Sequence, residues 1–218
     1  MICFETQRFH MVECQLRPNK VLDETLLAAF SSIPREMFVE EAMQGLAYVD
    51  EDLPLTRSRT LMEPVVQARL LQALQLRATD KVLEIASGTG YISAILSRLA
   101  GHVVAIDDDV SLCQKAQQNL NHQDVKNVRV YSSSLSDGWP SSAPYQAIII
   151  HGAVEHIPAP LAAQLAEGGR LACVVKSHNT QGVARLYQKM HGQLSWRDLF
   201  DAATPPLAAF NQKQNFAF

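Results

Sequence analysis

The sequence lacks paired cysteines, long apolar runs and an excess of positive charge, and each absence excludes a class of protein. Its four cysteines are far apart and form no C-x-x-C pair, which argues against a metal knuckle or a disulfide framework and favours thiols in a reducing cytoplasm. The apolar runs are much shorter than the roughly 20 residues of a membrane-spanning helix, and the first residues lack the apolar stretch of a secretory signal. A net charge of −3 gives no general attraction for nucleic acid or anionic membranes. Since nothing signals an obligate interface either, we expect a cytoplasmic monomer that binds neither nucleic acid nor membrane.

The N-terminal third of the chain is expected to be mostly helical with loops. The 218 residues, 47% of them hydrophobic, are enough for one domain with a buried core. Within residues 1–79, Asp23 can cap a helix that ends before Pro34, and Pro64 can begin another, because proline is favoured at the first helical position. Residues 50–63 show no periodicity, and loops of this length in compact domains are often functional.

Residues 80–218 contain short apolar runs that alternate with helical patterns. Such alternation predicts right-handed βαβ units and an α/β fold with a mostly parallel sheet. A glycine pair at 168–169 is expected to stop the last helix of the series. Residues 182–189 and 194–200 flank a turn at 191–192 and predict an antiparallel C-terminal hairpin. The expected strands are 81–85, 102–106, 128–131, 147–150 and 170–176, and the expected helices are 91–99, 110–120 and 159–166.

The segment VLEIASGTGY, residues 82–91, carries the strongest chemical signal. A buried strand that contains Glu84 is followed by a turn of small residues and then directly by a helix. Glycines in such a turn let a ligand approach the backbone, and the helix N-terminus offers unpaired N–H groups. Asp107 ends the next strand, where a carboxylate can accept both hydroxyls of a ribose. These features predict a nucleoside site at the carboxyl ends of the strands, where Tyr91 is expected to pack in its helix, with ligand contact as the second choice.

Two kinds of nucleoside remain open at this point. The dinucleotide pattern G-x-G-x-x-G is loosely satisfied by Gly88, Gly90 and Ser93, which allows a nicotinamide-dependent dehydrogenase. Glu84 at the mouth of the first strand would repel a pyrophosphate, whereas its charge favours a ligand with a cationic amino group and a sulfonium. The arrangement therefore favours S-adenosyl-L-methionine, and a methyltransferase over a dehydrogenase.

Four segments carry a resemblance to a known family: MVECQLRPNKVLDETLLAAFSSIPREMFV, AYVDEDLPL, VLEIASGTGYISAIL and APYQAIIIHGAVEHIPAPLAAQLAEGGRL. From about Met11 to Leu207, the chain resembles the protein-L-isoaspartate O-methyltransferases. The resemblance implies a Rossmann-like methyltransferase fold, in which residues 80–218 bind S-adenosyl-L-methionine and release S-adenosyl-L-homocysteine. Residues 1–79 would add helices and a substrate loop, and the two regions are expected to form one compact unit. The implied activity is repair methylation of isoaspartyl carboxylates in damaged proteins or peptides.

Several positions depart from the family pattern. Where the family has G-x-G-Q-T-I-S-Q-P, residues 56–64 read TRSRTLMEP, so Thr60 matches and the family's catalytic serine falls on Met62. Ser58 replaces a glycine and, together with Thr60, is expected to stand in partly for the lost hydroxyl. The family's aspartate near the adenine becomes Ser134. The spacing and the resemblance together assign donor binding to Glu84, Ala86, Ser87, Gly88, Gly90, Tyr91, Asp107, Asp108, Ser134 and Leu135.

Other polar residues are weaker candidates for the site. Arg57 and Arg59 either attract an anionic acceptor or are ordinary solvated loop charges. His151, His156 and Glu155 follow the fourth predicted strand and could include a general base, although a structural histidine is favoured. The histidines lack the spacing of metal ligands, so we expect no metal site.

The substitutions leave three functions open beside the minor dehydrogenase alternative. The leading one is an S-adenosyl-L-methionine-dependent methyltransferase of the isoaspartyl type. The second is the same donor chemistry on a different acceptor, such as a small molecule. The third is a catalytically silent donor-binding homologue, which is suggested by Ala86, Met62 and Ser134.

Overall fold

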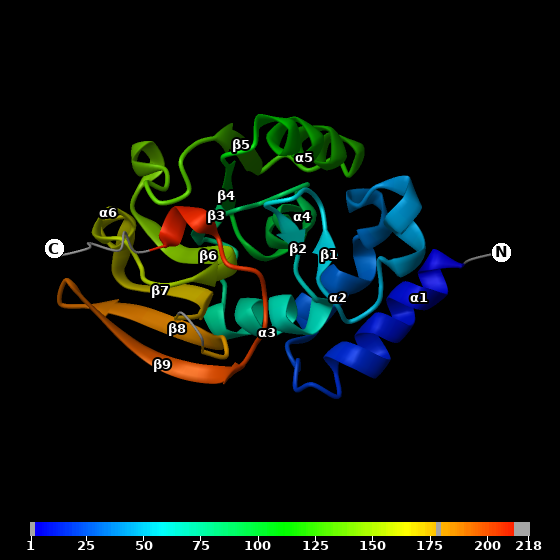
Figure 1. The fold of residues 1–218 in the computed structure, drawn as a ribbon, viewed down its shortest axis with the longest axis horizontal. Helices are drawn as coiled ribbons and strands as arrows, with labels where there is room; N and C mark the ends of the chain where they lie inside the picture. Colours follow the sequence, from blue (N-terminus) through cyan, green and yellow to red (C-terminus); the bar gives the residue numbers. More distant parts are fainter. Residues whose placement is uncertain (1–2, 178–179, 212–218) are drawn as a thin grey trace, which may run out of the picture.

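The computed structural model describes residues 3–177 and 180–211, which fold around one large sheet. Among these residues, seven strands pair in the order β5-β4-β3-β6-β7-β8-β9 (Figure 1). The strands from β5 to β7 run parallel, and β8 and β9 add an antiparallel hairpin at one edge. The strands are β3 (Lys81–Ile85), β4 (His102–Asp107), β5 (Val128–Ser132), β6 (Tyr145–Val154), β7 (Leu165–Val175), β8 (Val183–Met190) and β9 (Gln193–Asp201).

Helices cover both sides of this sheet and extend the molecule at one end. They are α1 (Phe4–His10), α2 (Glu24–Ser32), α3 (Pro64–Leu74), α4 (Tyr91–Leu99), α5 (Val110–His122) and α6 (Ala159–Ala163), and a π-helical segment, Met11–Leu16, continues α1. Short 3-10 helices lie at Arg35–Phe38, Glu41–Leu46, Pro140–Ser142 and Ala208–Phe210. Within the described ranges, no helix combines the length and the apolar character that crossing a membrane requires.

The core consists of two clusters on opposite faces of the sheet, because successive side chains of a strand point to opposite sides. On β3, Val82 belongs to the cluster that contains the buried faces of α2, α3 and α4. Its neighbour Leu83 belongs to the other cluster, which includes Leu161 of α6 and Phe210. A parallel sheet that is covered on both faces leaves the ends of its strands as the place for a site.

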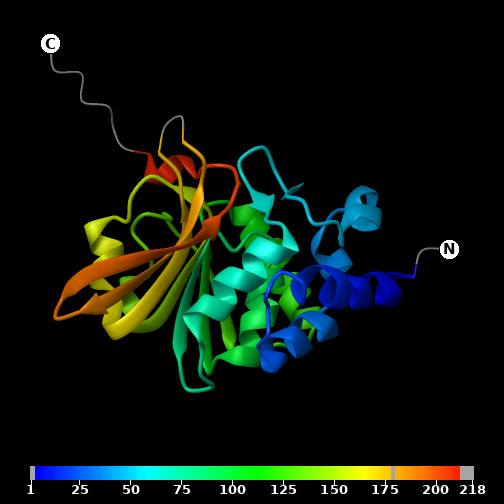
Figure 2. The ribbon, with the colours of Figure 1, turned by 90° about the horizontal axis from the view of Figure 1, so that it is seen from below.

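The N-terminal helices begin where the sequence predicts. Asp23 accepts hydrogen bonds from the N–H groups of Thr25 and Leu26, which caps α2, and Pro64 is the first residue of α3. α3 packs against β7 and β8. α1 lies at the end of the molecule away from the β8–β9 hairpin in both ribbon views (Figure 1 and Figure 2).

Residues 50–63, whose sequence shows no periodicity, contain a small hairpin. It pairs β1 (Leu53–Pro54) with β2 (Thr60–Leu61) in antiparallel register, Leu53 opposite Leu61. The N–H groups of Leu55 and Thr56 both donate to the carbonyl of Arg59, which closes the loop. We call residues 53–61 the 53–61 hairpin, because its loop approaches the ends of β3 and β4.

The predicted α/β architecture, with a mostly parallel sheet, an antiparallel C-terminal hairpin and N-terminal helices, is confirmed. Three predictions in its middle are wrong. The helix expected over 159–166 ends at Ala163, and the next strand begins at Leu165, before the glycine pair rather than after it. Leu165 pairs with Tyr145 at the start of β6, and a register shift follows, so tertiary pairing extends the strand through the glycines. β6 also continues to Val154, so that His151 lies inside a strand and not after one.

Candidate functional site

The two carboxylates that the sequence singled out lie near the carboxyl ends of neighbouring parallel strands. Glu84 on β3 and Asp107 on β4 are both fully buried. The sheet order reverses between β3 and β6, since the chain builds outward through β4 and β5 and then returns to the other side of β3. In open α/β sheets, ligands bind at such a switch point.

The turn after β3 has a backbone shape that favours small residues. Ala86, Gly88 and Gly90 have φ values of 60°, 57° and 89°, in the left-handed region that L side chains rarely adopt. The Ser87 N–H donates to the Ile106 carbonyl on β4, which fixes the turn to the neighbouring strand. The Ser87 hydroxyl is itself buried and has no hydrogen-bond partner among the described residues. The turn therefore presents an unsatisfied polar atom at the strand ends.

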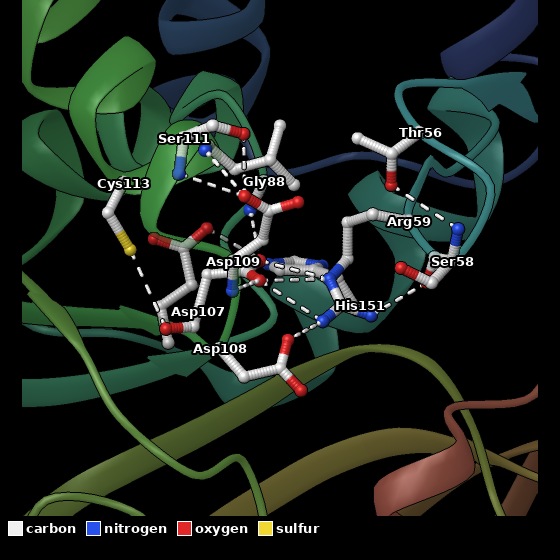
Figure 3. A network of polar contacts seen from close by, with 12 residues as sticks. Thr56, Ser58, Arg59, Gly88, Asp107, Asp108, Asp109, Ser111, Cys113 and His151 are labelled. Carbon is white, nitrogen blue, oxygen red and sulfur yellow. Dashed lines mark hydrogen bonds and ion pairs between the residues drawn. The ribbon is translucent and has the colours of Figure 1, made fainter.

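The Asp107 carboxylate accepts hydrogen bonds from two backbone groups and one side chain. The N–H of Gly88 lies 3.0 Å from Oδ2, and the N–H of Asp109 lies 3.1 Å from Oδ1. Arg59 of the 53–61 hairpin places Nε 3.1 Å from Oδ1 and 3.0 Å from Oδ2, and Nη2 3.1 Å from Oδ1. Figure 3 shows this guanidinium reaching from the hairpin to the carboxylate. The residue predicted to hold a ribose is thus covered by a cation of the same chain.

Burial of Arg59 excludes its interpretation as a solvated loop charge. Its side chain is only 4% exposed, whereas Arg57 on the same loop is exposed. Nη1 donates to the Ser58 carbonyl at 2.8 Å, and Nη2 also contacts the carboxylate of Asp108, which is 48% exposed. Arg59 therefore joins the hairpin to the end of β4 through one buried and one half-exposed acid.

Glu84 lies deeper, between β3, α4 and β6. Its Oε2 accepts a hydrogen bond from the Ser93 hydroxyl on α4. Nε2 of His151 lies 3.1 Å from Oε1, but the two atoms are not aligned as a hydrogen bond. His151 is 4% exposed, so its ring is buried beside the carboxylate. This position combines a buried acid with a titratable neighbour at the switch point.

The candidate catalytic positions lie along the 53–61 hairpin and just beyond it. Ser58 is exposed in the loop, and Thr60 is half-buried on β2. Met62 is fully buried in the core cluster that contains α2 and α3, so a thioether fills the position at which the resemblance puts a hydroxyl. Only Ser58 and Thr60 therefore retain a hydroxyl and some exposure.

Arg35, which the sequence analysis did not single out, holds the backbone at Met62. Its side chain is fully buried, and its guanidinium donates to the carbonyls of Ala47 and Met62, each at 2.7 Å, and to Oε1 of Gln67 at 3.0 Å. Its Cζ lies 4.8 Å from the ring centre of Tyr91. Burial lowers the pKa of the guanidinium. A cation at this depth positions the start of α3 relative to the hairpin.

Three further donor-binding candidates differ in where the structure puts them. The Tyr91 ring packs edge-on against Phe30 and Phe38, and burial raises its pKa to about 12, so its side chain faces the N-terminal helices. Leu135 is buried on the other face of the sheet. Ser134 is exposed, with its hydroxyl 3.2 Å from that of Ser136.

The remaining polar candidates lie just beyond the end of β6. His156 and Glu155 follow β6 and are half-buried. In the part of the chain that the structure describes, no group of three or more His, Cys, Asp or Glu side chains could hold a metal ion.

Comparison with known proteins places these features in a family context. Residues 7–209 match the model of a family described as Protein-L-isoaspartate(D-aspartate) O-methyltransferase. The Protein-L-isoaspartate O-methyltransferase 1 of Rhodopseudomonas palustris (strain HaA2) is 38% identical over 205 residues, which cover 94% of this chain and 84% of that protein.

Two solved structures share the fold at low sequence identity. One, named protein-L-isoaspartate O-methyltransferase, has a TM-score of 0.81 at 24% identity. The match covers 94% of this chain but only 65% of the chain in that structure. The other is a Plasmodium falciparum candidate of the same class in complex with S-adenosyl-L-homocysteine, with a TM-score of 0.79 at 15% identity. It matches 96% of this chain and all of its own length.

Proposed function

The chain belongs to the protein-L-isoaspartate O-methyltransferase family, and from this premise we propose that it methylates the carboxylate of isoaspartyl residues in proteins or peptides. The methyl donor is S-adenosyl-L-methionine, and S-adenosyl-L-homocysteine is the product that leaves. The observation that carries the proposal is the pair of buried acids, Glu84 and Asp107, on either side of a turn with left-handed backbone at a switch point of the sheet.

The residues at the strand ends fit this donor in their chemistry. The Ser87 hydroxyl is buried and lacks a hydrogen-bond partner among the described residues, so it can take one from a ligand. Oε1 of Glu84 has Nε2 of His151 at 3.1 Å, but the two atoms are not aligned as a hydrogen bond. Gly88 has a φ of +57°, which a larger residue would adopt only with strain, and an added Cβ would lie 2.8 Å from Cδ1 of Leu55. The assigned set of Glu84, Ala86, Ser87, Gly88, Gly90, Asp107 and Asp108 would hold the donor, with Ser134 and Leu135 beyond it and Tyr91 contributing its backbone.

The chain's own task is to balance charge, to align the reactants and to exclude water. S-adenosyl-L-methionine, when bound, supplies a methyl group that its sulfonium charge already activates. Glu84 contributes negative charge next to such a cation, and its burial strengthens that interaction. Alignment and exclusion of water can contribute about 7–11 kcal/mol to lowering the barrier.

An isoaspartyl acceptor removes the need for a general base, because its carboxylate is already a nucleophile. Burial of Met62 is therefore compatible with transfer, and we assign acceptor positioning to Thr60 and Ser58. A hydrogen bond of this kind is typically worth about 0.5–1.5 kcal/mol, so its loss slows a reaction without abolishing it.

We further propose that the protein repairs damaged proteins as a monomer in the cytoplasm, with residues 1–79 and 80–218 acting as one unit. The wide spacing of the four cysteines in the sequence, without a C-x-x-C pair, supports a reducing compartment.

The test is methyl incorporation from labelled S-adenosyl-L-methionine into an isoaspartyl peptide, with the same peptide containing ordinary aspartate as the matched control. We expect base-labile label in the isoaspartyl peptide only. Asp107→Asn should weaken binding of S-adenosyl-L-homocysteine in calorimetry, because an amide can accept on one side only.

Each negative outcome points to a different alternative. Donor binding without label in the isoaspartyl peptide would contradict the acceptor and favour the same chemistry on another substrate. Absence of heat and of a thermal shift at millimolar S-adenosyl-L-homocysteine would contradict donor binding and favour a catalytically silent module that keeps only the fold, in line with the substitutions at Met62 and Ala86.

A further inference from the structure

The Asp107 carboxylate has no capacity left for a ligand in this structure. A carboxylate offers about four lone-pair positions. The backbone N–H groups of Gly88 and Asp109 take one on each oxygen, and the Arg59 guanidinium occupies the rest through Nε and Nη2. The Arg59 side chain is 4% exposed and the Asp107 side chain is 0% exposed. A sugar can reach this acid only after Arg59 leaves it.

The same hairpin also covers the glycine turn. Leu55 begins the loop that contains Arg59, and its Cδ1 lies so close to Gly88 that an added Cβ would meet it at 2.8 Å. The loop is closed on itself by the bonds from the N–H groups of Leu55 and Thr56 to the Arg59 carbonyl. Arg59 is thus the polar anchor of a loop that lies over both the acid and the turn.

When Arg59 leaves Asp107, both side chains still have hydrogen-bond partners. The two hydroxyls of a ribose would supply two donors to the positions that the guanidinium vacates, while Gly88 and Asp109 keep theirs. Arg59 would retain the half-exposed carboxylate of Asp108 and the carbonyl of Ser58. Asp107 would keep its hydrogen-bond donors in this exchange, although neutral hydroxyls would replace its cationic partner.

We propose that Arg59 competes with the donor's ribose for Asp107 and so determines how tightly this chain binds its donor. The proposal rests on donor binding as proposed above and deepens it. It makes Arg59 a residue that sets the affinity of the donor site. The donor must open the 53–61 hairpin to bind, and removal of the guanidinium lowers the free energy that this opening requires.

Two effects of opposite sign distinguish competition from a structural role. Without Arg59, the buried Asp107 of the free protein loses its cationic partner, which lowers thermal stability. The protein with bound donor has already lost that contact, so the variant binds donor more tightly. A merely structural arginine would lower stability and affinity together.

The experiment is calorimetry and thermal unfolding of the full chain with S-adenosyl-L-homocysteine for Arg59→Gln and the control Arg57→Gln. Both substitutions remove one positive charge from the same loop, but only Arg59 is buried. We expect Arg59→Gln to bind S-adenosyl-L-homocysteine about tenfold more tightly, which corresponds to about 1.4 kcal/mol. Without ligand it should unfold at a lower temperature than the unmodified protein, and the ligand should raise its unfolding temperature by more. Arg57→Gln should match the unmodified protein.

Arg59→Lys keeps the charge but loses the planar fork that spans both oxygens, so it should fold readily and bind with intermediate affinity. If the unmodified protein binds and neither Arg59 variant binds more tightly, the inference is wrong while the proposed function stands. If none of the proteins binds at millimolar ligand, donor binding fails and the inference fails with it.

Discussion

Replacing Arg35 with methionine tests how the backbone next to the 53–61 hairpin is held in place. The guanidinium is fully buried, and its side-chain hydrogen-bond partners are neutral: the carbonyls of Ala47 and Met62 and the amide oxygen of Gln67. Methionine is apolar and unbranched, so it can fill most of the space along the arginine stem. It donates no hydrogen bond, so all three acceptors lose their partner.

The size of the effect follows from these contacts. Each buried acceptor left without a partner costs about 1–3 kcal/mol. The three bonds share one donor group, so the costs are coupled, and relief of the buried positive charge offsets part of them. We therefore expect the free energy of unfolding to fall by about 3–5 kcal/mol for Arg35→Met. For a chain of this length, that corresponds to a loss of about 6–20 °C in the melting temperature.

The measurement is urea unfolding followed by circular dichroism, with Arg98→Met as the matched control. Arg98 is exposed on α4, so the same exchange should change stability there by less than about 0.5 kcal/mol. A loss below about 1 kcal/mol for Arg35→Met, with an unchanged dependence on urea, would refute the buried network. Binding of S-adenosyl-L-homocysteine should weaken in the same variant, because the backbone at Met62 loses its support.

Two further predictions concern the acid at the start of α3 and a glycine in β6. Burial, reinforced by neighbouring aspartates, raises the pKa of Glu63 to about 7. Because its pKa is raised, the Glu63 carboxyl binds a proton more tightly in the folded protein than in the unfolded chain. The stability that this difference in proton binding contributes is lost as pH rises from about 4.5 to 7. Glu63→Gln should therefore be more stable than the unmodified protein by about 1 kcal/mol at pH 8, after allowance for solvent screening, and equal to it at pH 4.5; equal stability at both values in urea unfolding would contradict this. Gly152 has a φ of +142°, and an added Cβ would lie 2.6 Å from Cγ of Leu207, so Gly152→Ala should cost about 2–4 kcal/mol. Gly168→Ala, with positive φ but open space, should cost only about 1–2 kcal/mol, and equal costs for the two would show that the contact with Leu207 adds nothing.

The sequence predicts the parts of the fold that depend on local patterns. The Asp23 cap, the Pro64 start and the alternating strands and helices all follow from residues close in the chain, and the structure has them. The end of α6 could not be predicted in this way. Its glycine pair looks like a helix stop, but pairing of Leu165 with Tyr145 makes the same residues part of β7. Tertiary contacts decided there against local preference.

The candidate site divides in the same manner. Glu84 and Asp107 could be placed at strand ends, because every parallel strand brings its carboxyl end to one edge. The contact between Asp107 and Arg59 could not be predicted, because Arg59 is far away in the sequence and lies in a loop without periodicity. Arg35 was missed for a related reason, because an arginine whose partners are carbonyls leaves no charge pattern to find. For the contact between Arg59 and Asp107, the sequence offers only two signals, which are a cation in a long loop and an acidic run at 107–109.

The three consecutive aspartates at 107–109 occupy three different environments, and this has a consequence for insertions and deletions. The first points inward beneath Arg59, the second stands half in solvent, and the third caps α5 by accepting from the N–H groups of Ser111 and Leu112. Loss of one codon here would leave an almost unaltered acidic sequence, yet two residues cannot fill three such places. Variants of this edge must therefore preserve the spacing of the run, because its total negative charge does not determine which carboxylate lies beneath Arg59.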